Sequence, residues 1–181
     1  MTIIIYLIGK PGTGKYTIAK ELAKHDYIIC DNQLINNPVF ALLKYDGFKD
    51  IPEFAWEIIR KIRNNIFEFI TKEPENSYVL TNVLNEDEGD HKLFKQVENM
   101  ALQRSSLFVP VKLLISEAEN KKRVANSERA VRYKSLKIEE NMELINISHP
   151  HLLELDVSDL SPFEAAKKIL EHVIVFRKSY G

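Results

Sequence analysis

The sequence predicts an α/β protein, a three-layer αβα sandwich with a five-stranded parallel sheet at its centre. Short apolar runs rich in β-branched residues alternate along the chain with longer amphipathic stretches. The runs are apolar throughout, which is typical of parallel strands that are buried on both faces. The length of 181 residues fits one domain, so we expect a single domain over 1–181.

The order of these patterns gives the expected elements. The strands are expected at 3–8, 27–30, 78–84, 107–115 and 151–157. Helical periodicity covers about 15–24, 52–72, 90–104, 117–146 with a break, and 162–176. Ser161 and Pro162, followed by Glu164, form a typical start for the last helix.

Composition and charge exclude several classes of protein. Hydrophobic residues make up 45% and charged residues 28% of the chain, which excludes a disordered or low-complexity protein. The net charge of -1 gives no overall basic field for nucleic acid or anionic membrane. The apolar N-terminal run is much shorter than the roughly 20 residues of a membrane span, and the single cysteine fits a reducing compartment. We therefore expect a cytoplasmic protein without a membrane partner.

A glycine-rich segment follows the first expected strand and opens a helix. It reads Gly9-Lys-Pro-Gly-Thr-Gly-Lys15, which matches the spacing G-x-x-x-x-G-K. Glycines allow the backbone to turn consecutive N–H groups inward, and the helix start adds free N–H groups and a positive dipole end. Lys15 adds a full charge for the outer phosphates. The segment predicts a nucleotide phosphate site, with these candidate ligands: Gly9, Pro11, Gly12, Thr13, Gly14, Lys15, Tyr16 and Thr17.

The position after the lysine departs from this motif. A serine or threonine usually stands there and binds Mg²⁺ through its hydroxyl, whereas this chain has Tyr16 followed by Thr17. Thr17 is the candidate metal ligand, although it lies about 100° further round the helix. Magnesium held by the nucleotide phosphates, water and a nearby acid is the alternative.

Polar residues at the ends of the second and third strands form the expected acceptor side. Asp31 is the candidate base that orients an acceptor hydroxyl and takes its proton, with Asn32 and Gln33 as substrate contacts. A strand-end turn or a helix cap is the alternative for Asp31. Thr81 and Asn82 stand where many nucleotide hydrolases carry an acid, so Asn82 is either an acceptor contact or an ordinary buried polar residue.

Two further segments are candidates for covering the site. Residues 44–47 and the helix that carries Trp56 and Arg60 are candidate covers of the acceptor pocket, with Trp56 in the core as the alternative. Residues 121–137 hold seven basic residues and one acid. Beside a phosphate loop, this segment predicts a lid at about 117–137 that holds phosphates through arginine; a solvated helix face and an RNA-binding strip are the alternatives.

Taken together, these residues resemble the small P-loop kinases, the group of adenylate kinase-like, shikimate, gluconate and chloramphenicol-phosphorylating enzymes. The resemblance rests on 9–17, on Asp31, on Arg123 with Arg129 and Arg132, and on 155–158 before the last helix. It implies the strand order 2-3-1-4-5 and the phosphorylation of a small molecule with ATP and Mg²⁺. It also implies that Lys15, Arg123 and Arg129 bind phosphate, and that Asp31 is the base.

Two other functions remain open. Tyr16 favours an ATP-binding regulatory protein with weak ATPase activity. The basic segment would also suit a nucleic-acid end kinase, although the overall charge makes nucleic acid an unexpected partner. The sequence identifies neither the acceptor nor the oligomeric state.

Overall fold

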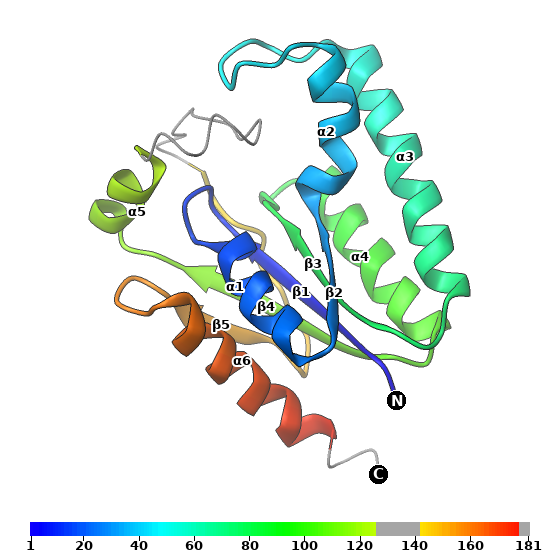
Figure 1. Cartoon of the computed structure of the whole chain (residues 1–181), viewed down its shortest axis with the longest axis vertical. Helices are drawn as coiled ribbons and strands as arrows, with labels where there is room; N and C mark the ends of the chain where they lie inside the picture. The colour runs from blue at the N-terminus through cyan, green and yellow to red at the C-terminus, as the bar shows by residue number, and fades with distance from the viewer. Residues whose placement is uncertain (126–141, 178–181) are drawn as a thin grey trace.

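The computed structural model describes residues 1–125 and 142–177 (Figure 1). At its centre, five parallel strands follow the order β2-β3-β1-β4-β5. The strands are β1 (Ile3–Gly9), β2 (Tyr27–Asp31), β3 (Ser77–Asn82), β4 (Leu107–Leu114) and β5 (Leu153–Asp156). The helices of the described ranges are α1 (Lys15–Leu22), α2 (Asn32–Leu42), α3 (Glu53–Lys72), α4 (Glu88–Gln103), α5 (Glu117–Val124) and α6 (Pro162–Arg177), with the 3-10 turn η1 (Ala23–His25). The predicted fold class and strand order are confirmed.

Helices cover both faces of the sheet. Successive side chains of β1 point to opposite faces, as the strand period of two requires. Ile5 belongs to a buried cluster with α1 and α6, and Tyr6 belongs to a second cluster with α2, α3 and α4. The α5 helix lies beyond the carboxyl edge, near the loop that follows β1 (Figure 1). Of the described helices, none combines the length and the apolar character that a membrane crossing needs.

The largest difference from the sequence prediction is α2. The predicted helices do not include 32–42. This segment is rich in asparagine and contains Pro38, and both features lower helix propensity. The helix forms because Asp31 caps it, accepting a hydrogen bond from the Leu34 N–H at 2.9 Å, and because Ile35, Val39 and Phe40 are buried on its inner face. The cap that was the alternative for Asp31 therefore exists.

Other boundaries differ by smaller amounts. The β3 strand ends at Asn82, and β5 begins at Leu153. The α5 helix ends at Val124, and residues 142–146 are not helical, so the prediction of a broken helix to 146 was wrong at that end. A backbone bridge between Leu144 and Asn85 replaces the helix there. Most of the predicted lid lies outside the described residues.

Candidate phosphate and acceptor site

The loop between β1 and α1 has the backbone conformation that its glycines allow. Gly12 and Gly14 have φ angles of 93° and 80°, in the left-handed region that glycine adopts without strain. Gly14 is the N-cap of α1, so the first backbone N–H groups of this helix, which have no acceptor within the helix, face the loop. Thr13 is fully buried, and its hydroxyl donates to the Lys10 carbonyl at 2.9 Å. This hydrogen bond stabilises the turn. The loop therefore offers backbone donors to an anion.

The Lys15 ammonium lies over this loop. Its Nζ donates to the carbonyl oxygens of Gly9 at 2.5 Å and Lys10 at 2.9 Å. These bonds hold a half-buried positive charge beside the backbone N–H groups of the first turn of α1. A cation and helix N–H groups at one place form the usual protein site for a phosphate group.

Tyr16 and Thr17, at the start of α1, lie in different environments. The Lys20 ammonium lies 5.8 Å from the centre of the Tyr16 ring. The Thr17 hydroxyl is exposed and donates to the Gly14 carbonyl at 2.7 Å. The hydroxyl proton of Thr17 is used in this hydrogen bond, so the lone pairs of the oxygen point away from the Gly14 carbonyl. Thr17 can therefore offer an oxygen to a cation.

The α5 helix packs directly on the phosphate loop. Asn120 Nδ2 donates to the Pro11 carbonyl at 2.6 Å. A Cβ on Gly12 would lie 2.7 Å from Asn120 Nδ2 and 2.9 Å from Val124 Cγ2. Only a glycine gives both the φ angle and the close approach of this helix.

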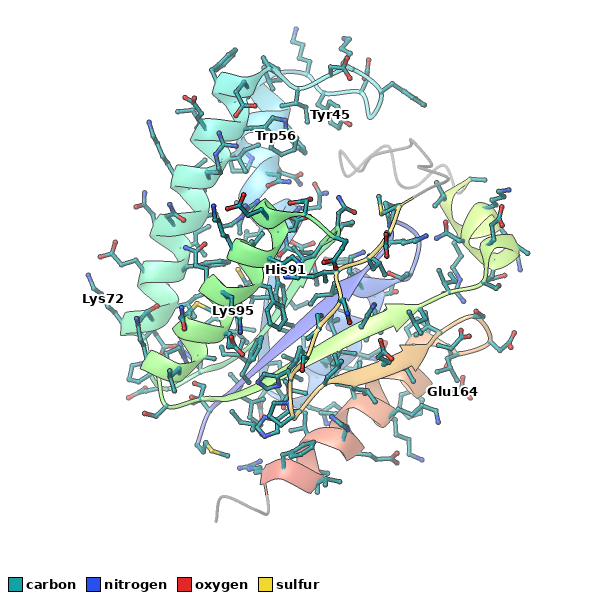
Figure 2. All side chains as sticks on the ribbon, turned by 180° about the vertical axis from the view of Figure 1, so that it is seen from behind. Tyr45, Trp56, Lys72, His91, Lys95 and Glu164 are labelled. Carbon is teal, nitrogen blue, oxygen red and sulfur yellow. The ribbon has the colours of Figure 1, made fainter. Side chains whose placement is uncertain are left out.

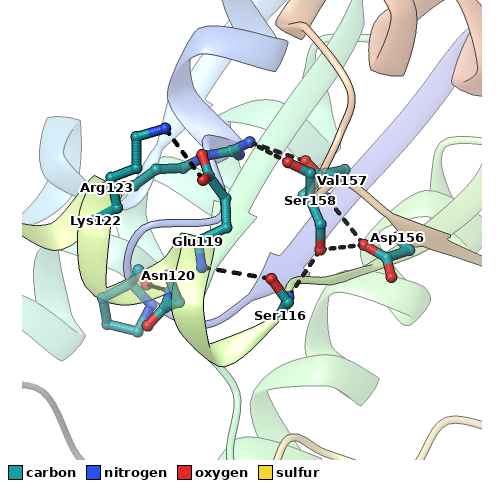
Figure 3. A network of polar contacts seen from close by, with 9 residues as sticks. Ser116, Glu119, Asn120, Lys122, Arg123, Asp156, Val157 and Ser158 are labelled. Carbon is teal, nitrogen blue, oxygen red and sulfur yellow. Dashed lines mark hydrogen bonds and ion pairs between the residues drawn. The ribbon is translucent and has the colours of Figure 1, made fainter.

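Arg123 joins α5 to the segment that follows β5 (Figure 3). Its Nε donates to Glu119 at 2.7 Å, and its Nη2 donates to the carbonyls of Val157 and Ser158, both at 3.0 Å. Ser158 is itself held by a hydroxyl bond of 2.6 Å to Asp156, which accordingly has a role in the turn. This network places the guanidinium beside the phosphate loop.

Two cavities meet at that loop. The larger, of about 620 Å³, is lined by the loop, the ends of β2 and β3, α2 and α3; the smaller, of about 300 Å³, is lined by the loop, α1, α6 and residues that follow β5. Gly14, Thr17 and Arg123 line both cavities. An elongated molecule can therefore lie across the loop with one end in each cavity.

Asp31 stands at the carboxyl end of β2 and lines the larger cavity. The residue is only 6% exposed. One carboxylate oxygen, Oδ1, caps α2. The next backbone N–H, of Asn32, donates to the Thr81 hydroxyl at 3.2 Å, which ties β2 to β3 at this edge. The capping bond therefore holds the Asp31 carboxyl at the edge of the sheet, beside the cavity.

Asn82 is the third polar residue of this edge, and its partners were not foreseen from the sequence. Its Oδ1 accepts a hydrogen bond from the Tyr6 hydroxyl at 3.1 Å, and its Nδ2 donates to Asn32 Oδ1 at 3.1 Å. Tyr6 is fully buried in the centre of β1, and this burial raises its pKa far above the ordinary value. The only signal in the sequence was one phenol inside an otherwise apolar run.

Aromatic side chains form the far wall of the larger cavity. Phe40 packs against Tyr45 with ring centres 4.9 Å apart and against Trp56 with centres 5.9 Å apart. Tyr45 and Trp56 lie together at the top of α3 (Figure 2). Trp56 thus lines the cavity and also packs against the core, while Arg60 pairs with Glu53 on the exposed face of α3.

A third cavity, of about 860 Å³, lies between α3 and α4. Lys72, His91 and Lys95 stand along it, and Lys72 and Lys95 pair with glutamates of their own helices at 2.5 and 2.7 Å. Pairs of this kind belong to a solvated helix surface. We therefore take the cavities at the loop as the candidate site.

The structure thus brings most of the predicted site residues to one place. The larger cavity is lined by Pro11, Gly12, Gly14, Lys15, Tyr16, Thr17, Asp31, Asn32, Gln33, Asn82 and Arg123. Gly9 and Thr13 support the loop from the side of β4, where a Cβ on Gly9 would lie 3.0 Å from the Leu113 carbonyl. Arg129 and Arg132 lie outside the described residues. Within the described ranges there is no cluster of three or more His, Cys, Asp or Glu side chains suited to a metal.

Comparison with known proteins supports this picture at the level of the fold. No protein-family model and no curated protein matches the chain. Among solved structures, a gluconokinase from Sinorhizobium meliloti matches with a TM-score of 0.61 and 12% identity over 98% of this chain and 95% of its own. The Deinococcus radiodurans tunicamycin resistance protein matches with a TM-score of 0.59 and 14% identity over 96% of each chain. The Mycobacterium tuberculosis APS kinase, solved with AMPPNP and APS, gives 0.58 and 14% over 95% of this chain and 97% of its own.

These similarities extend over almost the whole chain. Two of these three neighbours are kinases by name, the gluconokinase and the APS kinase. At sequence identities of 12–14%, structural similarity is evidence for the fold alone. The chain therefore has the fold of the small P-loop kinases.

Proposed function

We propose that this protein is an ATP-dependent phosphotransferase that moves the γ-phosphoryl group of ATP to a hydroxyl or phosphate group of a small molecule. One observation carries the proposal: two cavities meet at the phosphate loop, and the larger holds Lys15, Asp31 and Arg123 together. The smaller cavity suits the nucleoside of ATP, and the larger suits the acceptor. The kinases with the same fold support this assignment.

Three residues of the larger cavity have the chemistry that an in-line phosphoryl transfer to an alcohol requires. The acceptor oxygen forms a bond to the γ-phosphorus as the bond to the β-γ bridging oxygen breaks, and ADP leaves. The Asp31 carboxylate orients the hydroxyl and takes its proton. Lys15 and Arg123 stabilise the charge on the phosphate oxygens, the usual task of such cations. The capping bond to the Leu34 N–H keeps the Asp31 carboxylate in place.

Magnesium would bind mainly through the nucleotide phosphates and water. Thr17 lines the larger cavity, and oxygen is the ligand that Mg²⁺ prefers. Thr17 uses its proton on the Gly14 carbonyl, so its lone pairs fit a cation. A bound Mg²⁺ would neutralise part of the phosphate charge. Tyr16 stands in the position of the usual hydroxyl ligand, so Thr17 is the candidate protein ligand of this chain.

The test is a screen for phosphate transfer. The protein is incubated with Mg·ATP and a library of sugars, nucleosides, hydroxy acids and phosphorylated metabolites, and ADP formation is measured, with ³¹P NMR for the product. We expect one acceptor class to raise ADP formation by at least about tenfold, and Lys15→Ala to remove this rise. Lys20→Ala, on the exposed side of α1, is the matched control.

Two outcomes of the screen would count against the proposal. Tight ATP binding without stimulation by any compound would favour the nucleotide-binding regulator. Equal activity in Lys15→Ala and in the unmodified chain would show that the phosphate loop takes no part in the reaction.

A further inference from the structure

A side-chain amide of α2 lies almost completely buried in the wall of the larger cavity. Asn36 is 3% exposed and lines this cavity. Its Oδ1 has no hydrogen-bond partner among the described residues. Buried polar atoms are normally hydrogen-bonded, and a buried atom that stays unpaired costs free energy. The position of this amide therefore indicates that a molecule bound in the cavity supplies the missing hydrogen bond.

The Asn36 amide can offer such a molecule either kind of hydrogen bond. The torsion about the Cβ–Cγ bond of asparagine has a two-fold preference, so the amide oxygen and nitrogen can exchange places. The oxygen accepts hydrogen bonds and the nitrogen donates them. A ligand that carries a donor beside an acceptor can satisfy both atoms at once, as happens when asparagine binds the edge of an adenine base.

A second amide extends this polar strip. Gln33 precedes Asn36 by three residues, so both side chains lie on one face of α2. Gln33 also lines the larger cavity, and its Oε1 is buried without a partner among the described residues. The Oδ1 of Asn37 is unpaired in the same way, but Asn37 does not line the cavity. Asn37 is therefore a control for Asn36 within the same helix.

The aromatic wall of the cavity begins one helical turn from Asn36. Phe40 follows Asn36 by four residues, which places both side chains on the same face of α2. Phe40 packs against Tyr45 and Trp56, and all three rings line the cavity. Aromatic rings stack or pack edge to face with other flat rings. A flat ring that lies against this wall can therefore present its edge to Asn36.

These two features together favour one kind of ring. A nitrogen heterocycle has apolar faces and carries its hydrogen-bond donors and acceptors on its edge. A sugar ring carries hydroxyl groups around its whole rim, and each of them needs a partner when it is buried. Three aromatic side chains beside a strip of two amides therefore suit a heterocycle better than a sugar.

The charges that line the cavity suit neutral and anionic molecules alike. Lys15, Lys49 and Arg123 line it together with Asp31 and Asp50. The class of molecule therefore follows from the amides and the aromatic rings, and a phosphate group on the molecule is compatible with the site.

We propose that the acceptor carries a nitrogen heterocycle of the nucleobase kind, whose face lies against the aromatic wall and whose edge pairs with the Asn36 amide. Asn36 is the residue that determines specificity for this edge. The inference rests on the proposed function, since it concerns the acceptor of that reaction. It adds the class of molecule, a nucleoside or a nucleotide, and the residue that recognises it.

The first experiment measures binding by saturation-transfer NMR, with Mg·AMPPNP present to fill the nucleotide site. The probes are the four ribonucleosides and their 5′-monophosphates. Each is paired with a counterpart in which methyl groups replace the N–H hydrogens of the base edge, such as uridine and 3-methyluridine, and glucose represents a ring without such an edge. We expect at least one nucleoside or nucleotide to bind, and its methylated counterpart to bind at least about tenfold more weakly.

Two results of this experiment would overturn the inference. One is a methylated counterpart that binds as tightly as its parent. The other is binding of AMPPNP without binding of any nucleoside or nucleotide, whether or not glucose binds. Failure to bind AMPPNP would instead contradict the proposed function, so the two failures are distinguishable.

The second experiment uses Asn36→Leu, which keeps the branched shape of the side chain and removes both polar atoms. We expect the Kd of the bound probe to rise at least about tenfold, while the Kd of AMPPNP changes less than about twofold. Asn37→Leu is the matched control and should change neither Kd by more than about twofold. Thermal denaturation checks that each variant is folded, and Asn36→Ser gives the same comparison if the leucine variant does not fold.

Measuring both members of a probe pair on both proteins separates recognition from general stability. If Asn36 pairs with the base edge, the parent and its methylated counterpart should bind Asn36→Leu with Kd values within about twofold of each other. A preference for the parent that persists in Asn36→Leu, or an equal loss of probe binding in Asn37→Leu, would overturn the role of Asn36.

Discussion

Asn120 Nδ2 donates to the Pro11 carbonyl at 2.6 Å, and this bond ties α5 to the phosphate loop across 109 residues of sequence. The contact exists because Gly12 has no side chain at the place where α5 arrives. Arg123, three residues after Asn120, also lies at the loop, where its Nη1 would be 4.0 Å from a Cβ on Gly14. Loop and helix form one packed unit, so changes in either should act on nucleotide binding.

The first prediction concerns Gly12→Ala. The φ of 93° and the contacts of 2.7 and 2.9 Å that a Cβ would make require the loop and α5 to separate. We expect nucleotide affinity to fall at least about tenfold and the protein to lose about 1–2 kcal/mol of stability. Calorimetric titration and thermal denaturation measure the two effects.

Gly47→Ala is the control for Gly12→Ala. Gly47 also has a φ of 93°, but it lies in the segment between α2 and α3, away from α5. It should lose similar stability and keep nucleotide affinity. Equal loss of affinity in both variants would contradict the packing argument.

The second prediction concerns Asp31→Asn. Asparagine caps a helix as well as aspartate does, so stability should change by less than about 0.5 kcal/mol. Phosphate transfer should fall about 10²- to 10⁴-fold, because the base is removed while the acceptor site stays in place. Denaturant titration and steady-state kinetics measure both.

Asp87→Asn is the matched control, since Asp87 caps α4 through the Asp90 N–H at 2.9 Å. It should leave the transfer rate unchanged. Normal turnover in Asp31→Asn would contradict the role of Asp31 as the base.

The region around Asp31 shows which features can be predicted from the sequence and which cannot. The glycine loop and the five strands could be predicted from a motif and from apolar runs, because both depend on neighbours in sequence. The strand order was implied by the resemblance to the small P-loop kinases. The α2 helix was missed because its helix propensity is low, and the cap and the buried inner face that stabilise it depend on tertiary packing. The same holds for Tyr6, Asn82 and Asn32, which come from three elements and meet only when the sheet forms.

The third prediction concerns Arg123→Ala. This change removes a charged donor that joins α5 to the Val157 and Ser158 carbonyls. We expect a loss of about 2 kcal/mol of stability and a rise in the nucleotide Kd of about tenfold. Thermal denaturation with and without AMPPNP measures both effects.

Lys122→Ala is the neighbouring control for Arg123→Ala. The Lys122 side chain is 79% exposed and its ammonium lies 3.5 Å from Glu119. It should change stability by less than about 0.5 kcal/mol and leave nucleotide binding intact. A similar loss of affinity in both variants would indicate a general effect of positive charge.

The fourth prediction is a dependence of stability on pH through His149. Burial, together with the neighbouring His151, lowers the pKa of His149, while Glu98 opposes the shift and Lys95 adds to it. Because the unfolded chain takes up the proton first, the contribution of His149 to stability is present above the ordinary histidine pKa of about 6.5 and is lost as the pH falls. Protonation also removes the bond from the His151 N–H to Nδ1, which is 3.1 Å long.

Urea denaturation between pH 7.5 and pH 5 measures this effect. His149→Gln should flatten the loss of stability with falling pH, whereas His25→Gln, at an exposed position, should leave the slope as it is. An unchanged slope in His149→Gln would show that other groups cause the dependence.

The central claim is that the loop between β1 and α1 binds the phosphates of a nucleotide, and calorimetric titration of AMPPNP with and without Mg²⁺ tests it most directly. We predict saturable binding by the unmodified chain and at least about a hundredfold weaker binding by Lys15→Ala, with unfolding temperatures that stay close. A flat titration of the folded, unmodified chain under both conditions would contradict the account.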